Sequence, residues 1–250
     1  MKTLTDQLVD FLSKEIAKAG LNKAVLGLSG GLDSAVVCAL CAQAIGTKNV
    51  YAICLPYKTS LPESEAHASL CAKTFGVNYQ VINITKQIDA YFDNIDPAAS
   101  PLRRGNKISR ERMSILYDHS AKLGGLVIGT SNKTELLLGY GTLYGDMASA
   151  INPIGDIYKT KIFELARHLN VPEIILEKTP SADLWPGQSD EADLGYTYAQ
   201  IDELLAFIDK GEPKDSLQKR FDKDFVEKIL SMIEKSQFKR RMPLIAKLSV

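Results

Sequence analysis

Residues 27–34 of the 250-residue chain, Gly-Leu-Ser-Gly-Gly-Leu-Asp-Ser, have the residue types of a phosphate-binding turn, and we call them the glycine loop. Adjacent glycines allow backbone conformations that other residues avoid, so several N–H groups can face one anion. A helix expected to begin near Leu32 would add its positive end, and Ser29 and Ser34 would add hydroxyl donors. The loop lacks the lysine of a Walker motif and carries Asp33, which indicates a ligand for Mg²⁺ beside the phosphate.

The elements around the glycine loop are those that position such a site in a parallel sheet. The apolar run at 24–28 predicts a buried strand, and the pattern at 33–45 predicts a helix that stops at Gly46. Ligands of parallel α/β sheets bind at the carboxyl ends of strands, which is where the glycine loop follows. A plain strand-to-helix turn would also need glycines, but it would not need Asp33 and the flanking serines.

The same alternation of strands and helices continues along the chain. Further strands are predicted at 49–56, 78–84 and 125–130, and further helices at 63–76 and 106–124. This order predicts an α/β fold, a doubly wound parallel sheet with helices on both faces. The later segments are expected to be a glycine-rich loop that bears the site at 131–158, a helix at 159–169, a long polar stretch at 178–198, and closing helices at 197–210 and 222–237. We expect one domain, residues 1–250, with a helical C-terminal extension.

Composition and charge narrow the class of protein. Lys and Arg number 30 and Asp and Glu also number 30, so the charge gives no case for a nucleic-acid partner. No apolar run approaches the ~20 residues that span a membrane, and residues 1–16 resemble an amphipathic helix rather than a signal peptide. A cytoplasmic location without a membrane partner is expected. The Cys38-x-x-Cys41 pair lies in a predicted apolar helix with no second ligand pair, which favours core cysteines over zinc or redox chemistry.

Three stretches of the chain carry a family resemblance. The Ser-Gly-Gly-Leu-Asp-Ser sequence is similar to the pyrophosphate-binding signature of the N-type ATP pyrophosphatases, which cleave ATP between its α and β phosphates. Residues 129–166 and 180–198 closely resemble the NAD synthetase family, and Phe-Lys-Arg-Arg-Met-Pro at 238–243 resembles its basic tail. The resemblance implies an adenine nucleotide alpha hydrolase-like fold and ATP-dependent amidation of deamido-NAD through a dinucleotide adenylate, with release of AMP and pyrophosphate. It also implies Mg²⁺ as cofactor and a homodimer.

The resemblance implies a role for particular residues of this sequence. ATP contacts are expected from Gly27, Leu28, Ser29, Gly30, Gly31, Leu32, Asp33, Ser34, Thr130, Lys159 and Ser181. Asp33 and Glu135 match metal ligands, and Arg110 and Lys239 match contacts to deamido-NAD. Asp146 matches a carboxylate that holds ammonium and accepts its proton, and it is the expected catalytic residue together with Lys159. Cations are needed because the substrate carboxylate and the α-phosphate, both anions, must approach one another.

Each of these roles has a structural alternative. Glu135 could be a solvated helix residue, and Lys159 could be a charge at a helix N-terminus. Arg110 and Arg112 could form one exposed face of a helix.

The chain also departs from the family pattern. Leu143 and Ala150 stand where some members have lysine and aspartate, and Phe238 stands before Lys239 where the family has histidine. The substrate carboxylate is therefore expected to be held differently.

The nitrogen source is expected to be free ammonia. Glutamine-dependent members of the family carry an extra amidotransferase domain with a nucleophilic cysteine, and these 250 residues leave no room for one. Two other classes remain as alternatives, a tRNA-thiolating or other amide-forming pyrophosphatase and a non-catalytic nucleotide-binding module. The neutral charge speaks against the first alternative. The pairing of Asp33 with Glu135 speaks against the second, because binding alone needs no second metal ligand.

Overall fold

A four-stranded parallel sheet forms the centre of the structure, a computed structural model that describes residues 1–181, 183–185 and 187–248. The strands lie in the order β3-β2-β1-β4, with bounds β1 Ala24–Gly27, β2 Val50–Cys54, β3 Asn78–Val81 and β4 Leu126–Val127. Val25 of β1 pairs with Tyr51 on one side and with Val127 on the other. The chain proceeds outward from β1 to β3 and then returns to the other side of β1. The carboxyl end of β1 is therefore the switch point at which such sheets bind ligands.

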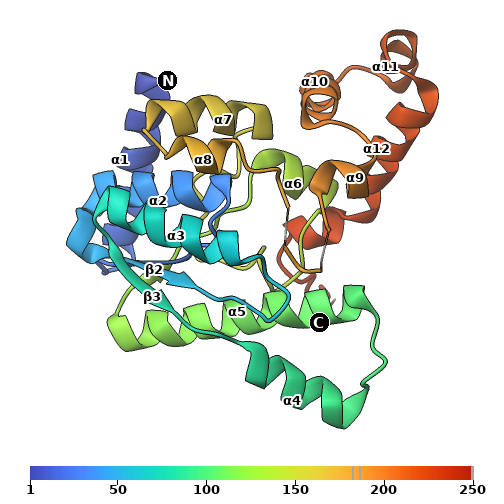
Figure 1. Cartoon of the computed structure of the whole chain (residues 1–250). Coiled ribbons are helices and arrows are strands. Elements are labelled where there is room, and N and C mark those ends of the chain that lie inside the picture. The colour runs from blue at the N-terminus through green and yellow to red at the C-terminus, as the bar shows by residue number, and fades with distance from the viewer. Residues whose placement is uncertain (182, 186, 249–250) are drawn as a thin grey trace.

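Helices cover both faces of this sheet (Figure 1). One face carries α1 Lys2–Lys18, α2 Leu32–Ile45, α3 Pro62–Phe75, α7 Lys159–His168 and α8 Glu173–Leu176. The other face carries α4 Thr85–Ile95 and α5 Pro101–Leu123. Helix α2 packs against α1, α3 and α7, so side chains around its whole circumference are buried, among them Val36, Val37 and Leu40. The core thus fixes the helix that the glycine loop begins.

The last part of the chain is a helical extension with an apolar core of its own. It comprises α9 Asp190–Leu194, α10 Tyr198–Asp209, α11 Lys214–Arg220, α12 Lys223–Lys235 and the 3-10 helix Gln237–Arg240, and it rests on α6 Lys133–Leu138. Its buried side chains include Ile201, Leu204 and Val226, and Leu138 of α6 belongs to the same cluster. Because α6 also packs against α7, it links the helical extension to the helices of the sheet.

The predicted architecture is confirmed, and the differences concern the bounds and the number of its elements. The parallel sheet with helices on both faces is present, and α2 and α3 end at glycines with positive φ, Gly46 and Gly76. The helix predicted at 106–124 begins earlier, at Pro101, because the side chain of Ser100 caps it and proline is favoured at the first helical position. The strand predicted at 125–130 is reduced to Leu126–Val127.

Five α-helices of the described residues were not predicted, namely α4, α6, α8, α9 and α11. Helix α6 lies in the segment that was expected to be a loop, and its six residues are too few to show a periodic pattern. Helix α4 has buried Ile88 and Phe92 four residues apart, which is a helical spacing in the sequence.

The cysteines lie in the core, as expected from the sequence. The four cysteines are free and buried, Cys38, Cys41 and Cys71 in helices and Cys54 in a strand. None of the helices in the described ranges is long and apolar enough to cross a membrane.

Candidate active site

The glycine loop lies between the carboxyl end of β1 and the start of α2, as predicted. Gly30 has a φ of +77°, and a Cβ at this position would lie 2.0 Å from the carbonyl oxygen of Ser64. Only glycine combines this conformation with so close an approach of another backbone. Gly31 is the N-cap of α2, and no side chain in the described residues caps the first N–H groups of that helix. Such a helix start is suited to bind an anion.

The two serines of the glycine loop hold its shape. The Ser29 N–H donates to the Ser34 hydroxyl at 3.3 Å, and the Gly31 N–H donates to the Ser29 hydroxyl at 3.2 Å. The Ser34 hydroxyl donates to the Gly31 carbonyl at 2.9 Å, and Ser34 is buried. These short-range bonds close the loop on itself, so Ser34 has a structural part in addition to its predicted contact with phosphate.

Three helices bring Asp33, Glu135 and Lys159 together beside the glycine loop. The Lys159 ammonium forms an ion pair with Asp33 Oδ2 and lies 3.8 Å from Glu135 Oε1. Their side chains are 4%, 15% and 18% exposed for Lys159, Asp33 and Glu135 respectively. Asn132 places Glu135 through a reciprocal capping box, and its Nδ2 donates to Asp33 Oδ1 at 2.9 Å. The predicted metal ligands and the predicted ATP-contacting lysine therefore form one cluster.

Burial and the charges within the cluster shift the pKa values of Glu135 and Lys159. Burial raises the pKa of Glu135 to about 8, and the negative charge of Asp33 adds to this shift while Lys159 opposes it. Burial alone would lower the pKa of Lys159, but the charges of Asp33 and Glu135 raise it above its ordinary value. Lys159 is therefore a fixed cation, and Glu135 readily accepts a proton when no further cation is nearby.

Asp190 is a third carboxylate near this cluster, and it was not among the residues predicted from the sequence. It is buried at the start of α9, where the Tyr198 hydroxyl donates to its Oδ2 at 2.9 Å and the Tyr140 hydroxyl to its Oδ1 at 3.2 Å. Burial raises the pKa of Asp190, and the positive charge of Lys159 counteracts this effect. A sequence signal existed, because Asp190 lies inside the stretch at 180–198 that carries the family resemblance.

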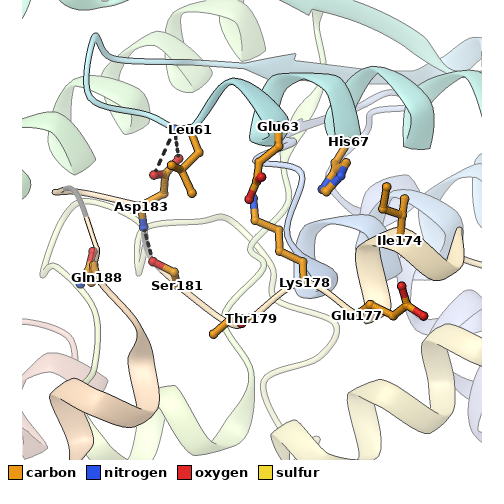
Figure 2. A pocket seen from close by; sticks show the side chains of 10 residues that line it. All are labelled: Leu61, Glu63, His67, Ile174, Glu177, Lys178, Thr179, Ser181, Asp183 and Gln188. Carbon is orange, nitrogen blue, oxygen red and sulfur yellow. Dashed lines mark hydrogen bonds between the residues drawn. The ribbon is translucent and has the colours of Figure 1, made fainter.

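Thr130 and Ser181 approach the site from two other segments. Thr130 follows β4, two residues after the bridge between Ile128 and Ile151, so it lies at the carboxyl edge of the sheet. Ser181 lines a pocket of about 350 Å³ together with the start of α3, the end of α8, and Lys178, Thr179, Asp183 and Gln188 (Figure 2). Its hydroxyl accepts from the Asp183 N–H at 3.1 Å.

Asp183 joins this pocket to the glycine loop. Its carboxylate accepts from the Leu61 N–H at 3.1 Å and from the Ser64 hydroxyl at 3.0 Å (Figure 2 shows the bonds to Leu61). The Ser64 hydroxyl also accepts from the Lys178 ammonium at 2.7 Å, and the Ser64 carbonyl faces Gly30. The pocket that Ser181 lines is thus directly adjacent to the glycine loop.

Asp146 lies in the loop after α6, on a more open part of the site. Its Oδ1 accepts from the Ser109 hydroxyl and from the Thr142 N–H at 3.0 Å, and its own N–H donates to the Ser109 hydroxyl at 2.8 Å. Both bonds to the carboxylate thus end on Oδ1. The other oxygen, Oδ2, lies close to Gly141, since a Cβ built on that glycine would be 2.8 Å from Oδ2. The residue itself is exposed. Among the described residues both donors bind Oδ1, so Oδ2 is available to a small cation.

The predicted dinucleotide contacts, Arg110 and Lys239, lie near the same loop. The Arg110 Nε–H donates to the Leu143 carbonyl at 3.2 Å, and the Lys239 ammonium donates to the carbonyls of Gly139 and Gly141 at 2.8 Å each. Burial lowers the pKa of Lys239, and the charge of Asp146 counteracts that effect. Both cations therefore brace the loop that carries Asp146.

Arg112 differs from its neighbour and does not belong to an exposed helix face. Its Nε–H donates to the Leu55 carbonyl at 3.0 Å, which is the residue after β2, and its Nη2 lies 3.4 Å from the Ser60 hydroxyl. Burial lowers the pKa of Arg112, and the charges of Asp183 and Asp146 oppose the shift. Arg110 is exposed and Arg112 is not, so only Arg110 fits the alternative of an exposed helix face.

The carboxylates beside the glycine loop fit Mg²⁺. Asp33 and Glu135 are hard oxygen ligands, and burial together with the charge of Asp33 raises the pKa of Glu135, an effect that a bound cation would offset. Within the described residues, no three Asp, Glu, His or Cys side chains meet around one point. The remaining ligands would thus be water and phosphate oxygens, which Mg²⁺ usually keeps.

Comparison with known proteins gives consistent matches along the chain. A family model described as NAD synthase matches residues 4–243. An NH₃-dependent NAD⁺ synthetase from Trichlorobacter lovleyi is 58% identical, covering 99% of this chain and 91% of that protein. The NH₃-dependent NAD synthetase of Campylobacter jejuni, solved in complex with the nitrate ion, is 35% identical with a TM-score of 0.84, covering 98% of both chains. The NMN synthetase of Francisella tularensis is 31% identical with a TM-score of 0.89, covering 99% of this chain and 98% of that one.

Proposed function

The chain belongs to the NAD synthase family, and from that premise we propose how its residues carry out the reaction. The protein is a ligase that amidates deamido-NAD to NAD, with ATP as the energy source and ammonia as the nitrogen donor. The observation that supports the assignment of residues most strongly is the buried cluster of Asp33, Glu135 and Lys159 beside the glycine loop.

The reaction divides into two steps that involve the same carboxyl group of the substrate. In the first step the carboxylate of deamido-NAD attacks the α-phosphorus of ATP, and the bond to the β-phosphate breaks, which releases pyrophosphate. In the second step ammonia attacks the carbonyl carbon of the resulting adenylate, and AMP leaves with the former carboxylate oxygen. The adenylate forms on the substrate, so the protein needs no covalent intermediate of its own.

We assign ATP to the side of the site that the glycine loop forms. The free N–H groups at the start of α2 would receive the pyrophosphate portion, and Thr130 and Ser181 would add hydroxyl contacts. Lys159 would offset the negative charge that develops on the leaving group, since its ammonium is fixed and remains protonated. Water is largely excluded from Lys159, which strengthens this interaction.

Asp33 and Glu135 are the residues that would hold Mg²⁺. Bound there, the ion would neutralise phosphate charge and polarise the α-phosphorus. Asp33 Oδ2 pairs with Lys159 and its Oδ1 with Asn132, so Asp33 is oriented from both sides. Glu135 is oriented by the N–H of Asn132 through the capping box. These contacts keep both carboxylates aimed at the same region.

We assign the ammonium ion to Asp146. Ser109 and Thr142 hold Oδ1 in place, which leaves Oδ2 to accept a hydrogen bond and then a proton from ammonium. The proton transfer converts the unreactive cation into ammonia, which has the lone pair needed for attack. The exposure of Asp146 gives ammonium from solvent access to this carboxylate.

Deamido-NAD is assigned to the loop at 139–146 and its two cations. Arg110 and Lys239 would contact the dinucleotide, and both already bind backbone carbonyls of this loop. Leu143 takes part through its carbonyl oxygen, which does not depend on its side chain. The hydrogen bond from Arg110 to this carbonyl can therefore form even though Leu143 stands where some family members have lysine.

We propose a single functional domain over residues 1–250 that acts as a homodimer in the cytoplasm. The helical extension shares buried contacts with α6 and α7, which supports one unit. Buried, free cysteines are compatible with a reducing compartment. The homodimer rests on the family resemblance.

Isotope labelling tests the adenylate mechanism directly. Deamido-NAD with ¹⁸O in its carboxylate would transfer one labelled oxygen to AMP, and mass spectrometry of AMP would detect it. Label in pyrophosphate or in phosphate instead would overturn the proposed attack on the α-phosphorus.

A second experiment would replace deamido-NAD with nicotinate mononucleotide, because one structural neighbour is named for NMN as product. We expect the dinucleotide to be the preferred acceptor.

A further inference from the structure

Helix α10, in the helical extension, presents two residues one turn apart to Lys159. The ring of Tyr198 lies 5.3 Å from the Lys159 ammonium, which is a cation–π contact. Asp202, four residues later, lies under the backbone at the start of α7, the helix that Lys159 begins. The family resemblance gave neither residue a role, and both lie in the closing helix predicted at 197–210.

Asp202 is a buried carboxylate with a defined hydrogen-bond partner for each oxygen. It is 5% exposed, its Oδ2 accepts from the Thr160 N–H at 2.8 Å, and its Oδ1 accepts from the Thr134 hydroxyl. The Thr134 hydroxyl in turn accepts from the Lys159 N–H at 3.0 Å. One carboxylate thus joins the first turn of α7 to the first turn of α6 by direct and relayed hydrogen bonds.

These bonds replace a local helix cap. Tyr158 is the N-cap of α7, and its side chain makes no capping bond to that helix in the described residues. The first N–H groups of a helix otherwise lack partners, and here those of Lys159 and Thr160 are satisfied by Thr134 and Asp202. A negative charge at this helix end is also favoured by the helix dipole.

The same contacts fix the helix turns that carry Lys159 and Glu135, two residues of the proposed ATP site. Lys159 is the first residue of α7, and Thr134 is adjacent to Glu135 in the first turn of α6. Building on the proposed function, we propose that Asp202 is a positioning residue that sets the distance between the Lys159 ammonium and the Glu135 carboxylate for ATP binding. Asp202 itself contacts neither substrate, and it acts through Thr134 and the backbone of α7.

Asp209 offers a matched control on the same helix. It lies at the end of α10 and also links α6 with the segment before α7, since it accepts from the Tyr158 hydroxyl at 2.6 Å and pairs with Lys133 at 2.5 Å. Its side chain is 36% exposed, and it contacts neither Thr134 nor the first N–H groups of α7 in the described residues. A purely structural fastening of α10 would make the two aspartates equivalent.

The test compares steady-state kinetics of the full chain with four single variants. Asp202→Ala and Thr134→Val should raise the KM for ATP by roughly ten- to a hundredfold, because a small misplacement of a positioned group has effects of that order. The KM for deamido-NAD should stay within about twofold. Thr134→Ser keeps the hydroxyl and should restore the KM for ATP, and Asp209→Asn should leave it unchanged. Circular dichroism at the assay temperature identifies any variant that is unfolded.

A double-variant cycle separates this proposal from the proposed role of Lys159. If Asp202 acts through Lys159, adding Asp202→Ala to Lys159→Ala should raise the KM for ATP by less than about twofold further. Independent, multiplicative effects would overturn the positioning role. A Lys159→Ala variant with an unchanged KM for ATP would instead overturn the assignment of Lys159.

Asp202→Asn covers the case in which Asp202→Ala does not fold. The amide retains one acceptor oxygen but places an N–H₂ group opposite one of the two donors, so we expect an intermediate rise in the KM for ATP. Equal rises in the KM of both substrates, or an effect of Asp209→Asn as large as that of Asp202→Asn, would overturn the proposal.

Discussion

Lys159 and Asp146 are the two residues proposed to act in the reaction, and their surroundings differ. The Lys159 side chain is 4% exposed and lies between Asp33, Glu135 and the ring of Tyr198, which come from three other helices. Asp146 is exposed, lies in a loop, and has its carboxylate held through one oxygen. The ATP side of the site is thus part of the packed structure, whereas the ammonia side lies on its surface.

The difference follows from the cost of burying charge. A buried ion needs partners with good geometry, and removing one partner leaves an uncompensated charge in a poorly solvated place. An exposed carboxylate keeps its hydration and loses little when its neighbours change. We therefore expect substitutions on the ATP side to impair both steps of the reaction, and substitutions on the ammonia side to impair only the second.

The largest effect is expected for Asp33→Asn. The amide keeps the size of the side chain but removes the charge beside Lys159 and a proposed ligand of Mg²⁺. Turnover should fall by at least about a hundredfold, as for the loss of one strong electrostatic contact in an active site. ATP consumption and NAD formation should fall together in a steady-state assay. Asp156→Asn is the control, because Asp156 is a highly exposed partner of Lys133. A loss of turnover below tenfold for Asp33→Asn would contradict the assignment of Asp33 to the binding of Mg²⁺ and ATP.

The next effect concerns Asp146→Ala, which should separate the two steps. Amide formation should fall by roughly a hundredfold or more, which is the usual contribution of a positioned acid or base. Exchange of labelled pyrophosphate into ATP, measured with deamido-NAD but without ammonium, should stay within a few-fold of the wild type. Raising the pH should reduce the defect, since more of the ammonium is then already deprotonated. Equal loss of exchange and amidation would contradict the role of Asp146.

A smaller effect is expected at the glycine loop itself. Gly30→Ala introduces a Cβ at a φ of +77° and within 2.0 Å of the Ser64 carbonyl oxygen, so the loop must shift. Gly76→Ala has the same backbone strain at a φ of +67°, but a Cβ there would meet nothing within 4 Å among the described residues.

Gly76→Ala should lower the free energy of unfolding by about 1–3 kcal/mol, as for a side chain forced into a left-handed conformation. Gly30→Ala should lower it further, because its Cβ also meets the Ser64 carbonyl oxygen. Only Gly30→Ala should also raise the KM for ATP, by several-fold, because only there does the phosphate-binding backbone move. Urea denaturation and steady-state kinetics would measure the two effects. A KM for ATP that Gly76→Ala raises as much as Gly30→Ala would show that the loop geometry is not the cause.

The smallest effect is a dependence on pH that arises from Glu135. Burial and the charge of Asp33 raise its pKa from 4.5 to about 8, so the folded, ligand-free chain retains a proton that the unfolded chain releases. The free energy of unfolding should therefore fall as the pH rises from about 5 to about 8, and level off above that. Chemical denaturation across this range would measure the slope, and Glu135→Gln should reduce it.

Binding of ATP with Mg²⁺ should have the opposite proton balance. The ion requires an ionised carboxylate, so binding at pH 7 should release up to about one proton, a usual consequence of metal binding. Calorimetry in two buffers with different ionisation enthalpies would count the protons. Unchanged release in Glu135→Gln would assign the proton to another group.

The sequence predicted the glycine loop and its neighbours well because the signal there is contiguous. A strand, two glycines and a helix start follow one another, and the φ of Gly30 and the close approach of Ser64 explain why glycine is needed. The same holds for the helix stop at Gly46. Local conformational limits of the backbone determine these features, so they need no knowledge of the fold.

The sequence did not reveal Asp190, Asp202 or Arg112, because their roles depend on distant contacts. Asp202 meets Thr134 from 68 residues away, and Arg112 meets Leu55 from 57 residues away. In the sequence Asp202 and Arg112 are charged residues on predicted helices and Asp190 lies in a long polar stretch, so each resembles a solvated residue. Their burial depends on packing between segments that are distant in the sequence, and no local sequence pattern indicates such packing.

The central claim is that this chain couples the cleavage of ATP to the amidation of deamido-NAD with free ammonia. The most direct test mixes the purified protein with ATP, Mg²⁺ and deamido-NAD, and with either ammonium or glutamine, and follows NAD, AMP and pyrophosphate together. We expect equal amounts of all three products with ammonium and no NAD with glutamine. AMP and pyrophosphate without NAD in the presence of ammonium would contradict the claim, because the cleavage of ATP would then serve a different acceptor.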